Sequence, residues 1–260
     1  MKAHFVIVVS LLGGCGGGGG GAGGSLPELP PVPIVVNEEP GGIWFGVRPN
    51  GTEIVVLVSE AGDIRILDLF GNQGYGTVRV SNGAEISASY RVVPEFGRTL
   101  IDGSDFADCT FAGTVSARQS MTVEISCLTS LGGQLGGGDV VLTYDPIYDT
   151  DSSIARIAGT YQNPEGDIMT IDINGALFLQ NAQYGCVVNG RVSLLDTEWN
   201  LYGVDLETDN CQAEAAPLNG TRWSGLAAIT VVDSADVVFG GITGEVNGLG
   251  ASRIVAWLRI

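Results

Sequence analysis

Short apolar runs of five to nine residues follow one another from about residue 41 to the end of the chain. Several of them alternate polar with apolar residues, as in MTVEISC (121–127) and IMTIDI (168–173). This period of two is typical of strands with one buried face, and the runs are rich in Val and Ile, which favour strands. No stretch keeps a helical period over ten residues. The pattern predicts an all-β protein.

Tight turns are marked by the dipeptide Asn-Gly, which occurs six times, at 50–51, 82–83, 174–175, 189–190, 219–220 and 247–248. This dipeptide favours a two-residue turn with positive φ at both central positions. Three of the six lie directly between strand-like runs, so we expect antiparallel hairpins.

The chain contains an approximate internal repeat. Cys109–Ser116 and Cys186–Ser193 share the pattern C-x-x-x-G-x-V-S, and in each case a second cysteine follows after another apolar run. Upstream, Gly42-Ile-Trp44 and Gly159-Thr-Tyr161 each open a series of strand-like segments. We therefore predict two β domains related by duplication, residues 41–146 and 157–260, joined by the linker 147–156.

Each half has room for six to eight antiparallel strands. Closure of a sheet on itself removes exposed edges, so a small barrel is the expected form and a β-sandwich is the alternative. The motif Gly42-Ile-Trp44 resembles the first strand of lipocalins and related barrels. That resemblance implies an arginine packed on the aromatic ring. Tyr161 with either Arg253 or Arg259 fits this in the second half, whereas the end of the first half, GDVVLTYDP (138–146), has no arginine.

The first 14 residues have the order of a secretory signal: Lys2, an apolar run to Leu12, then small residues. The run is too short to cross a hydrocarbon layer of roughly 30 Å as a helix. Leu12-Gly13-Gly14-Cys15 resembles the lipobox of bacterial lipoproteins, which implies cleavage before Cys15 and acylation of that cysteine, for example with palmitate. The alternative is an ordinary signal peptide with an unrelated cysteine. Gly16 resembles the sorting pattern of outer-membrane lipoproteins.

Residues 15–40 form the predicted tether. Gly16–Gly24, interrupted only by Ala22, has the composition of a flexible linker, and SLPELPPVP (25–33) favours an extended spacer. We therefore expect a folded body held away from a lipid surface, facing either the periplasm or the cell exterior.

A resemblance of wider extent covers almost the whole mature chain. The segments LTYDPIYDTDSSIARIAGTYQ (142–162), GC…GRVS (185–193) and NGTRWSGLA (219–227) are similar to a group of uncharacterised two-domain bacterial lipoproteins. The resemblance implies a lipid-anchored, all-β, exported protein. It brings no activity and no catalytic residue.

The charge balance limits the partners. The chain has 12 basic and 29 acidic residues and a formal net charge of −17. This charge repels phosphate backbones, so we expect no nucleic-acid partner, and contact with the membrane through the anchor alone. The remaining partner, in the envelope or outside the cell, is not identified by the sequence.

Four cysteines remain after Cys15, an even number that suggests two disulfides in an exported protein. Of the three possible pairings we favour sequence neighbours, Cys109 with Cys127 and Cys186 with Cys211. Each bond would stabilise the fold by about 3 kcal/mol in the chain-entropy model. The rival is a metal site of four thiolates, which an oxidising compartment disfavours. We therefore expect no metal and no cofactor.

Catalytic chemistry is restricted because Lys2 and His4, the only lysine and histidine, lie in the predicted signal. Nucleophiles activated by histidine or lysine are excluded in the mature chain. The glycine-rich segment 132–139 lacks the lysine of a phosphate-binding loop and reads as a hairpin loop. Carboxylates remain, in two groups: Asp102, Asp105 and Asp108 in one, and Asp205, Glu207 and Asp209 in the other. They fit a glycosidase pair or a calcium site less well than a solvated acidic surface.

Four aromatic residues, Trp44, Tyr161, Trp223 and Trp257, either line a ligand cavity or fill the core; in small barrels filling is commoner. The first hypothesis is therefore a non-enzymatic, lipid-anchored outer-membrane lipoprotein that acts as a binding or structural module. The alternative is a lipocalin-like carrier of a small apolar ligand. A carboxylate-dependent glycan hydrolase is the third possibility.

Overall fold

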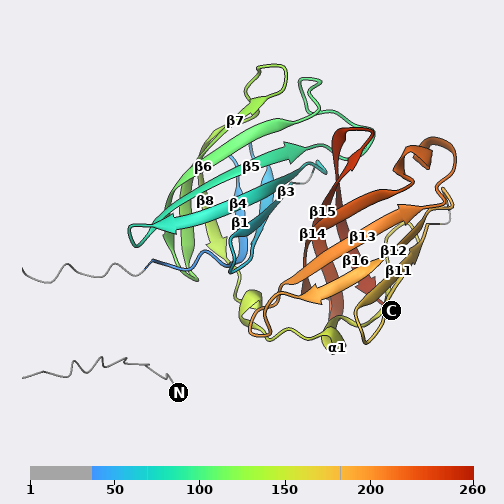
Figure 1. The fold of residues 1–260 in the computed structure, drawn as a ribbon. Helices are drawn as coiled ribbons and strands as arrows, with labels where there is room; N and C mark the ends of the chain where they lie inside the picture. Colours follow the sequence, from blue (N-terminus) through green and yellow to red (C-terminus); the bar gives the residue numbers. More distant parts are fainter. Residues whose placement is uncertain (1–36, 69, 182) are drawn as a thin grey trace, which may run out of the picture. The chain divides into compact units, whose positions relative to one another are not determined.

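The chain forms two closed eight-stranded antiparallel barrels in tandem (Figure 1). The computed structural model describes residues 37–68, 70–181 and 183–260. In each barrel every strand pairs with the next along the chain, and the last strand pairs with the first. The predicted all-β class and the two barrel-like domains are confirmed. The predicted signal, Cys15 and the tether as far as residue 36 lie outside the described residues.

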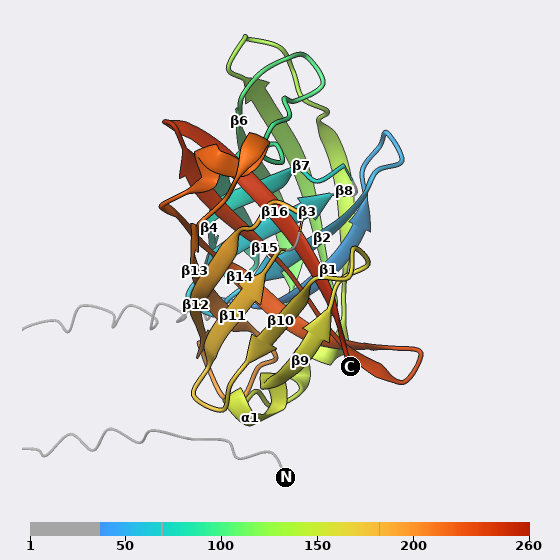
Figure 2. The ribbon, with the colours of Figure 1, turned by 90° about the vertical axis from the view of Figure 1, so that its right-hand side faces the viewer.

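The first barrel contains β1 (Gly42–Val47), β2 (Glu53–Val58), β3 (Asp63–Asp68), β4 (Gln73–Ser81), β5 (Glu85–Val93), β6 (Ala107–Ser116), β7 (Ser120–Thr129) and β8 (Gly138–Tyr144). The second contains β9 (Gly159–Gln162), β10 (Ile168–Ile171), β11 (Ala176–Gln180), β12 (Val187–Leu194), β13 (Tyr202–Asp209), β14 (Thr221–Val232), β15 (Ala235–Val246) and β16 (Leu249–Arg259). Figure 2 shows the second barrel, coloured yellow to red, facing the viewer.

The described residues also form three short helices: η1 (Pro146–Asp149), α1 (Ile154–Ile157) and η2 (Ala213–Leu218). The first two lie between the barrels in sequence, and α1 is at one end of the second barrel in Figure 2. No helix among the described residues is long and apolar enough to cross a membrane.

Buried and exposed residues alternate through β6, through β7 and through β5 as far as Val92, as the period of two predicts. The buried set points into the first barrel, where it includes large aromatic side chains. The rings of Tyr90 and Phe111 lie 6.2 Å apart, and those of Trp44 and Tyr144 lie 5.1 Å apart edge to face. The interior of the first barrel is therefore filled by side chains that pack against one another.

The Asn-Gly dipeptides do not all adopt the same conformation. Positive φ at both residues occurs at Asn82-Gly83, between β4 and β5, and at Asn247-Gly248, between β15 and β16. Asn247-Gly248 is the predicted two-residue turn, since Val246 pairs with Leu249. The loop that contains Asn82-Gly83 has three residues, because Ser81 pairs with Glu85. Asn189-Gly190 instead continues β12, so the expectation of a turn there is wrong.

Both predicted disulfides are present. Cys109 and Cys127 are directly opposite on β6 and β7, and both are buried. Cys186 and Cys211 join the residue before β12 to the segment after β13. Each bond therefore staples neighbouring antiparallel strands.

The repeated motif C-x-x-x-G-x-V-S lies on non-equivalent strands, the sixth of the first barrel and the fourth of the second. Its glycines share a local role. A Cβ at Gly113 would clash with the Thr122 carbonyl, and a Cβ at Gly190 would clash with the Asp205 carbonyl. The motif thus marks a stapled hairpin in which a glycine allows close approach of the next strand.

Side chains of both barrels meet at a buried junction, where β15 packs against β3 and β4 and β16 packs against β4 and β5. The Gln73 amide donates to the Ile242 carbonyl at 3.0 Å, and the Ser252 hydroxyl donates to the Gly71 carbonyl at 3.0 Å. Gln73 and Ser252 are both fully buried. Ser252 also donates its backbone N–H to the Pro94 carbonyl at 3.0 Å, so the chain after β5 lies beside β16.

The end of the first barrel near η1 is closed by aromatic and acidic side chains. Tyr148 stacks on Trp199 with ring centroids 5.4 Å apart and donates its hydroxyl to Glu60 at 3.1 Å. Burial raises the pKa of Glu60, although the Tyr148 hydroxyl opposes the shift. The native state therefore binds the Glu60 proton more tightly than the unfolded chain.

This linkage predicts a pH-dependent effect of Glu60→Gln. Because the pKa of Glu60 is higher in the native state than in the unfolded chain, protonation of Glu60 stabilises the fold. This contribution is fully present below the pKa that Glu60 has in the unfolded chain, and it is lost as pH rises through the pKa that it has in the native state. The glutamine does not titrate. The free energy of unfolding of the variant, minus that of wild type, should thus become more positive between about pH 4 and about pH 7.5. Urea unfolding across this range measures it.

Glu124→Gln is the matched control, because Glu124 is exposed on β7. Its difference from wild type should change less with pH. A Glu60→Gln difference that stays constant or becomes more negative as pH rises would contradict the assignment.

Candidate functional site: a cavity in the second barrel

The second barrel encloses a cavity of about 610 Å³. Apolar side chains from most of its strands line the cavity, among them Leu179, Val188, Leu206 and Val255. These four alternate along their strands with outward residues, yet they are only half-buried. An inward side chain keeps exposed surface only where the barrel is not filled, so the interior of the second barrel is hollow.

Two tryptophans line the cavity wall. Trp223 donates its indole N–H to the Thr208 hydroxyl at 2.9 Å, and Trp257 is buried on β16. The Trp223 hydrogen bond satisfies the one polar group of the ring, so its apolar surface can face the cavity.

Tyr161 and Trp44 lie in the packed cores rather than on the cavity wall. The Tyr161 hydroxyl donates to the Ile157 carbonyl at 2.7 Å. The Arg259 guanidinium lies 5.7 Å from the Tyr161 ring centroid, so the expected arginine on this ring is Arg259 and not Arg253. Trp44 is fully buried in the first barrel and donates its N–H to the Pro40 carbonyl.

The mouth of the cavity includes a segment of the first barrel. Glu95–Arg98, in the connection between β5 and β6, contributes to the lining, and Phe96 packs against the apolar core of the second barrel. The backbone contact of this segment with Ser252 holds it in place. The rim of the site is therefore built from both barrels.

Polar side chains gather at this mouth and bond to one another. Asp167 accepts from Asn163 at 3.2 Å and from Asn181 at 2.7 Å. Glu95 and Arg98 form an ion pair at 3.1 Å. A hydrogen bond to the Glu214 carboxylate raises the pKa of Tyr184. The site thus combines an apolar interior with a polar rim, an arrangement suited to a molecule that is itself mainly apolar.

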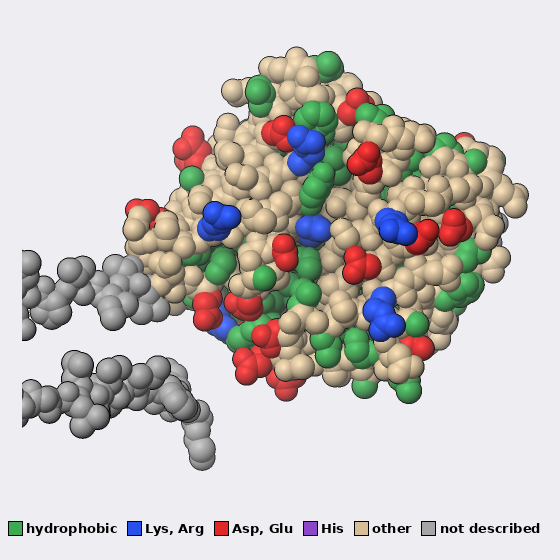
Figure 3. Space-filling view, viewed as in Figure 1, with side chains coloured by type: hydrophobic (Ala, Val, Ile, Leu, Met, Phe, Trp, Pro, Cys, Tyr) green, Lys and Arg blue, Asp and Glu red, His purple; other side chains and the backbone are tan. Residues whose placement is uncertain are grey.

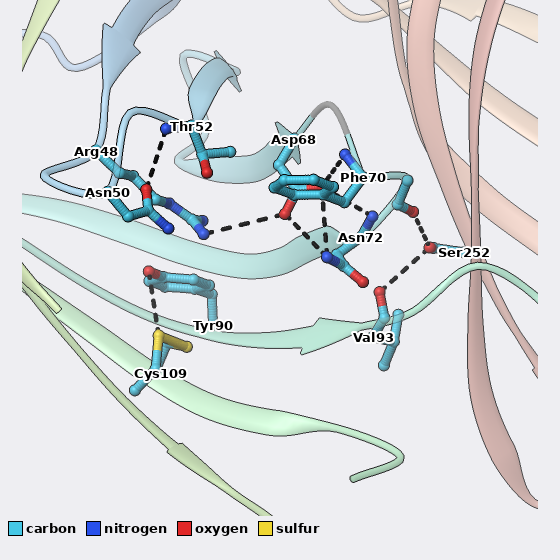
Figure 4. A network of polar contacts seen from close by, with 12 residues as sticks. Arg48, Asn50, Thr52, Asp68, Phe70, Asn72, Tyr90, Val93, Cys109 and Ser252 are labelled. Atoms are coloured by element: carbon cyan, nitrogen blue, oxygen red, sulfur yellow. Dashed lines mark hydrogen bonds and ion pairs between the residues drawn. A yellow bond between two sulfur atoms is a disulfide. The ribbon is translucent and has the colours of Figure 1, made fainter. Parts of the chain in front are cut away.

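The corresponding end of the first barrel is closed by a polar network (Figure 4). Arg48, at the end of β1, lies 4.0 Å from Asp68, at the end of β3, and both side chains are largely buried. The Asp68 carboxylate also accepts from the backbone of Phe70 and of Asn72. The Tyr90 hydroxyl lies 3.9 Å from Cys127 Sγ, deeper in the same barrel.

A second hollow, of about 890 Å³, lies outside the barrels and is more open. It is a groove between the outer face of the first barrel, including Phe45, Val47 and Val141, and residues of β15 and β16. Its lining also includes the acidic residues Glu53, Asp68 and Asp139, and Asp68 is the buried partner of Arg48.

The acidic candidates from the sequence do not form one site. Asp102 accepts from the Thr129 hydroxyl at 2.6 Å and from the Ser104 backbone at 3.0 Å, which lowers its pKa and stabilises a loop. Asp108 forms a surface ion pair with Arg91 at 2.8 Å, and Asp105 belongs to the loop before β6.

The second acidic group lies on the outer face of β13. Asp205, Glu207 and Asp209 alternate with inward Val204, Leu206 and Thr208, so the predicted shared face is present and turns away from the cavity. Glu207 lies 3.6 Å from Arg222. No group of three metal-ligating side chains occurs among the residues that the structure describes.

The glycine-rich segment 132–139 lies in the hairpin connection between β7 and β8 and runs into the first two residues of β8. Figure 3 shows acidic and basic side chains interspersed on one face of the molecule. Neither feature adds a binding site to the cavity.

The cavity leads to a prediction that compares inward valines of the two barrels. Val188→Phe fills empty space, so the free energy of unfolding should stay unchanged or rise by up to about 1 kcal/mol. Val123, 1% exposed in the packed first barrel, has no such space, so Val123→Phe should lower stability by about 1–3 kcal/mol. Urea unfolding of both variants is the measurement. Equal losses in both would show that the second barrel is as tightly filled as the first.

In comparisons with known proteins, no family model matches the chain and no curated protein matches it in sequence. The functional argument therefore depends on the geometry of the second barrel.

Proposed function

We propose that the protein is a non-enzymatic, lipid-anchored lipoprotein of the outer membrane whose second barrel binds a small apolar molecule. The observation that carries this proposal is the cavity of about 610 Å³ lined by aliphatic and tryptophan side chains. Sites for small molecules commonly enclose about 300–1,000 Å³ and are mainly apolar with a few polar groups. Transfer of apolar ligand surface from water to this interior supplies the binding free energy, at about 25 cal/mol per Å².

The anchor is supported by the lipobox-like Leu12–Cys15 and the tether that follows it. Each buried methylene of an acyl chain contributes about 0.8 kcal/mol, so two or three chains on Cys15 hold the protein at the membrane. The two disulfides fit export to an oxidising compartment. An anchored binding protein keeps its ligand near the surface from which an apolar molecule comes or to which it is delivered.

A purely structural module is less well supported, because the second barrel leaves apolar side chains unpacked where the first barrel fills its interior. A glycan hydrolase is also disfavoured. The acidic residues that such an enzyme requires lie on the outer face of β13 and in or beside the loop before β6, where Arg222, Arg91 and Thr129 hold three of them.

The ligand prediction is tested on wild-type protein extracted under mild conditions and transferred into native mass spectrometry. We expect a copurifying apolar molecule of a few hundred daltons, a size that the cavity accommodates. Val188→Phe, which occupies part of the cavity, should lower the bound fraction.

Val141→Phe provides the matched control. It adds the same atoms to the outer groove, where Val141 is 59% exposed, and should leave the bound fraction unchanged. Absence of any adduct from wild type, together with no binding of added apolar probes, would contradict the proposal. Loss of the adduct in Val141→Phe alone would move the site to the groove.

The anchor is tested separately with Cys15→Ala in the native host. Wild-type protein should incorporate an alkyne analogue of palmitate and sediment with outer membranes, whereas the variant should remain unlabelled. Hydroxylamine-resistant label at the N-terminus, located by mass spectrometry of the first mature peptide, identifies amide-linked acyl chains. Unacylated wild-type protein in the culture medium, starting at another residue, would refute the anchor without affecting the cavity.

A further inference from the structure

The wall of the second barrel has a gap beside β16. This strand pairs with β15 at ten positions but with β9 only at Leu258 and Arg259. The next contact on the β9 side is at Ser252, whose N–H donates to the Pro94 carbonyl of the first barrel. Six residue steps separate Ser252 from Leu258, a length of about 20 Å along a strand. Among the described residues, no strand pairs with β16 between these two positions on this side.

The gap borders the cavity. Val255, in the middle of the unpaired stretch, is an inward residue of β16 and lines the cavity, as do both ends of the β9–β10 turn, Asn163–Asp167. The alternation of the strand directs the main-chain groups of Ile254 and Ala256 to the same side as those of Ser252. In the part of the chain that the structure describes, these groups have no main-chain partner on that side. Hydrogen bonding therefore does not close this part of the wall.

A turn of the first barrel, Glu95–Arg98, lies over the gap, and we call it the cover turn. Phe96 is half-buried, lines the cavity and packs against the core of the second barrel. The ion pair of Glu95 with Arg98 and the bond from the Arg98 N–H to the Glu95 carbonyl at 3.0 Å stay within the turn. Residues 97–99 are exposed, and none of them forms a hydrogen bond to a described residue of the second barrel. Beyond the bridge of Glu95 with Ser252, the packing of one ring thus holds the cover turn in place.

The other parts of the rim are fixed more firmly. The disulfide between Cys186 and Cys211 secures the side that carries η2. On the β9–β10 side, the Asp167 carboxylate accepts hydrogen bonds from Asn163 and Asn181. Segments with few buried apolar contacts and few hydrogen bonds open at the lowest cost in free energy. The cover turn is therefore the part of the rim that moves most easily.

We propose that the ligand enters and leaves the second barrel through the gap between β9 and β16, and that Phe96 is the gate. The inference rests on the proposed function. Opening requires the Phe96 ring to leave the apolar wall of the cavity, while Pro94 stays bonded to Ser252. An apolar molecule then passes Val255 into the interior, and no strand pairing of either barrel is broken. The first barrel, whose own interior is filled, thus controls access to the second.

The test follows an uncharged fluorescent probe, N-phenyl-1-naphthylamine, in stopped-flow mixing with purified full-length lipoprotein at one fixed detergent concentration. Energy transfer from tryptophan reports the bound probe, because Trp223 and Trp257 line the cavity. Phe96→Ala should raise the association and dissociation rate constants about tenfold each, since the packing of a phenyl ring, which opening must break, has at least that magnitude. The dissociation constant, which is their ratio, should change by less than about threefold.

Phe178→Ala is the matched control, because Phe178 is 46% exposed on the outer face of β11. Its rate constants should equal those of wild type. Phe96→Leu keeps a smaller apolar side chain and should give intermediate rate constants, and it carries the test if Phe96→Ala does not fold. Unchanged rate constants in the Phe96 variants, or faster dissociation without faster association, would overturn the gate and leave Phe96 as a wall residue of a binding cavity. Absence of energy transfer in wild type at any probe concentration would instead contradict the proposed function.

Discussion

Closure of an eight-stranded sheet fixes the width of its interior, and the side chains that point inward decide what that interior can do. Both barrels close in the same way: consecutive strands pair as hairpins, and the last strand pairs with the first. In the first, Trp44, Tyr90 and Phe111 occupy the lumen together with a disulfide. In the second, aliphatic residues such as Val188 and Leu206 reach less far and leave a cavity. The same strand topology thus forms one barrel with a packed interior and one barrel with a cavity.

The junction makes the two barrels parts of one site. Gln73 and Ser252 are fully buried, and their hydrogen bonds cross from one barrel to the other. A buried hydrogen bond that loses one partner leaves an unsatisfied group, which costs about 1–3 kcal/mol. The contact of Ser252 with Pro94 positions Phe96 at the mouth of the second barrel. The second barrel taken alone would therefore have a different rim.

Much of the fold could be predicted from the sequence because its signals are local. The alternation in MTVEISC indicates a half-buried strand. The even number of cysteines after Cys15 and their order along the chain are enough to predict that sequence neighbours pair. The hollow interior could not be predicted in this way. Trp223 and Trp257 look the same in sequence as Trp44, yet two line a cavity and one lies in a core. The difference depends on which side chains meet across the barrel, and that is a non-local property. Likewise, nothing around Phe96 indicates that a loop of one barrel covers another.

The disulfide between Cys186 and Cys211 makes the shape of the cavity depend on the redox conditions around the protein. Cys186 belongs to the cavity wall, and the disulfide cross-links the start of β12 to the segment between β13 and η2. In a reducing environment this disulfide would be reduced, and the segments before β12 and after β13 would no longer be cross-linked. Under the proposed function, the cavity wall therefore takes its final form only in an oxidising compartment, where this disulfide can form.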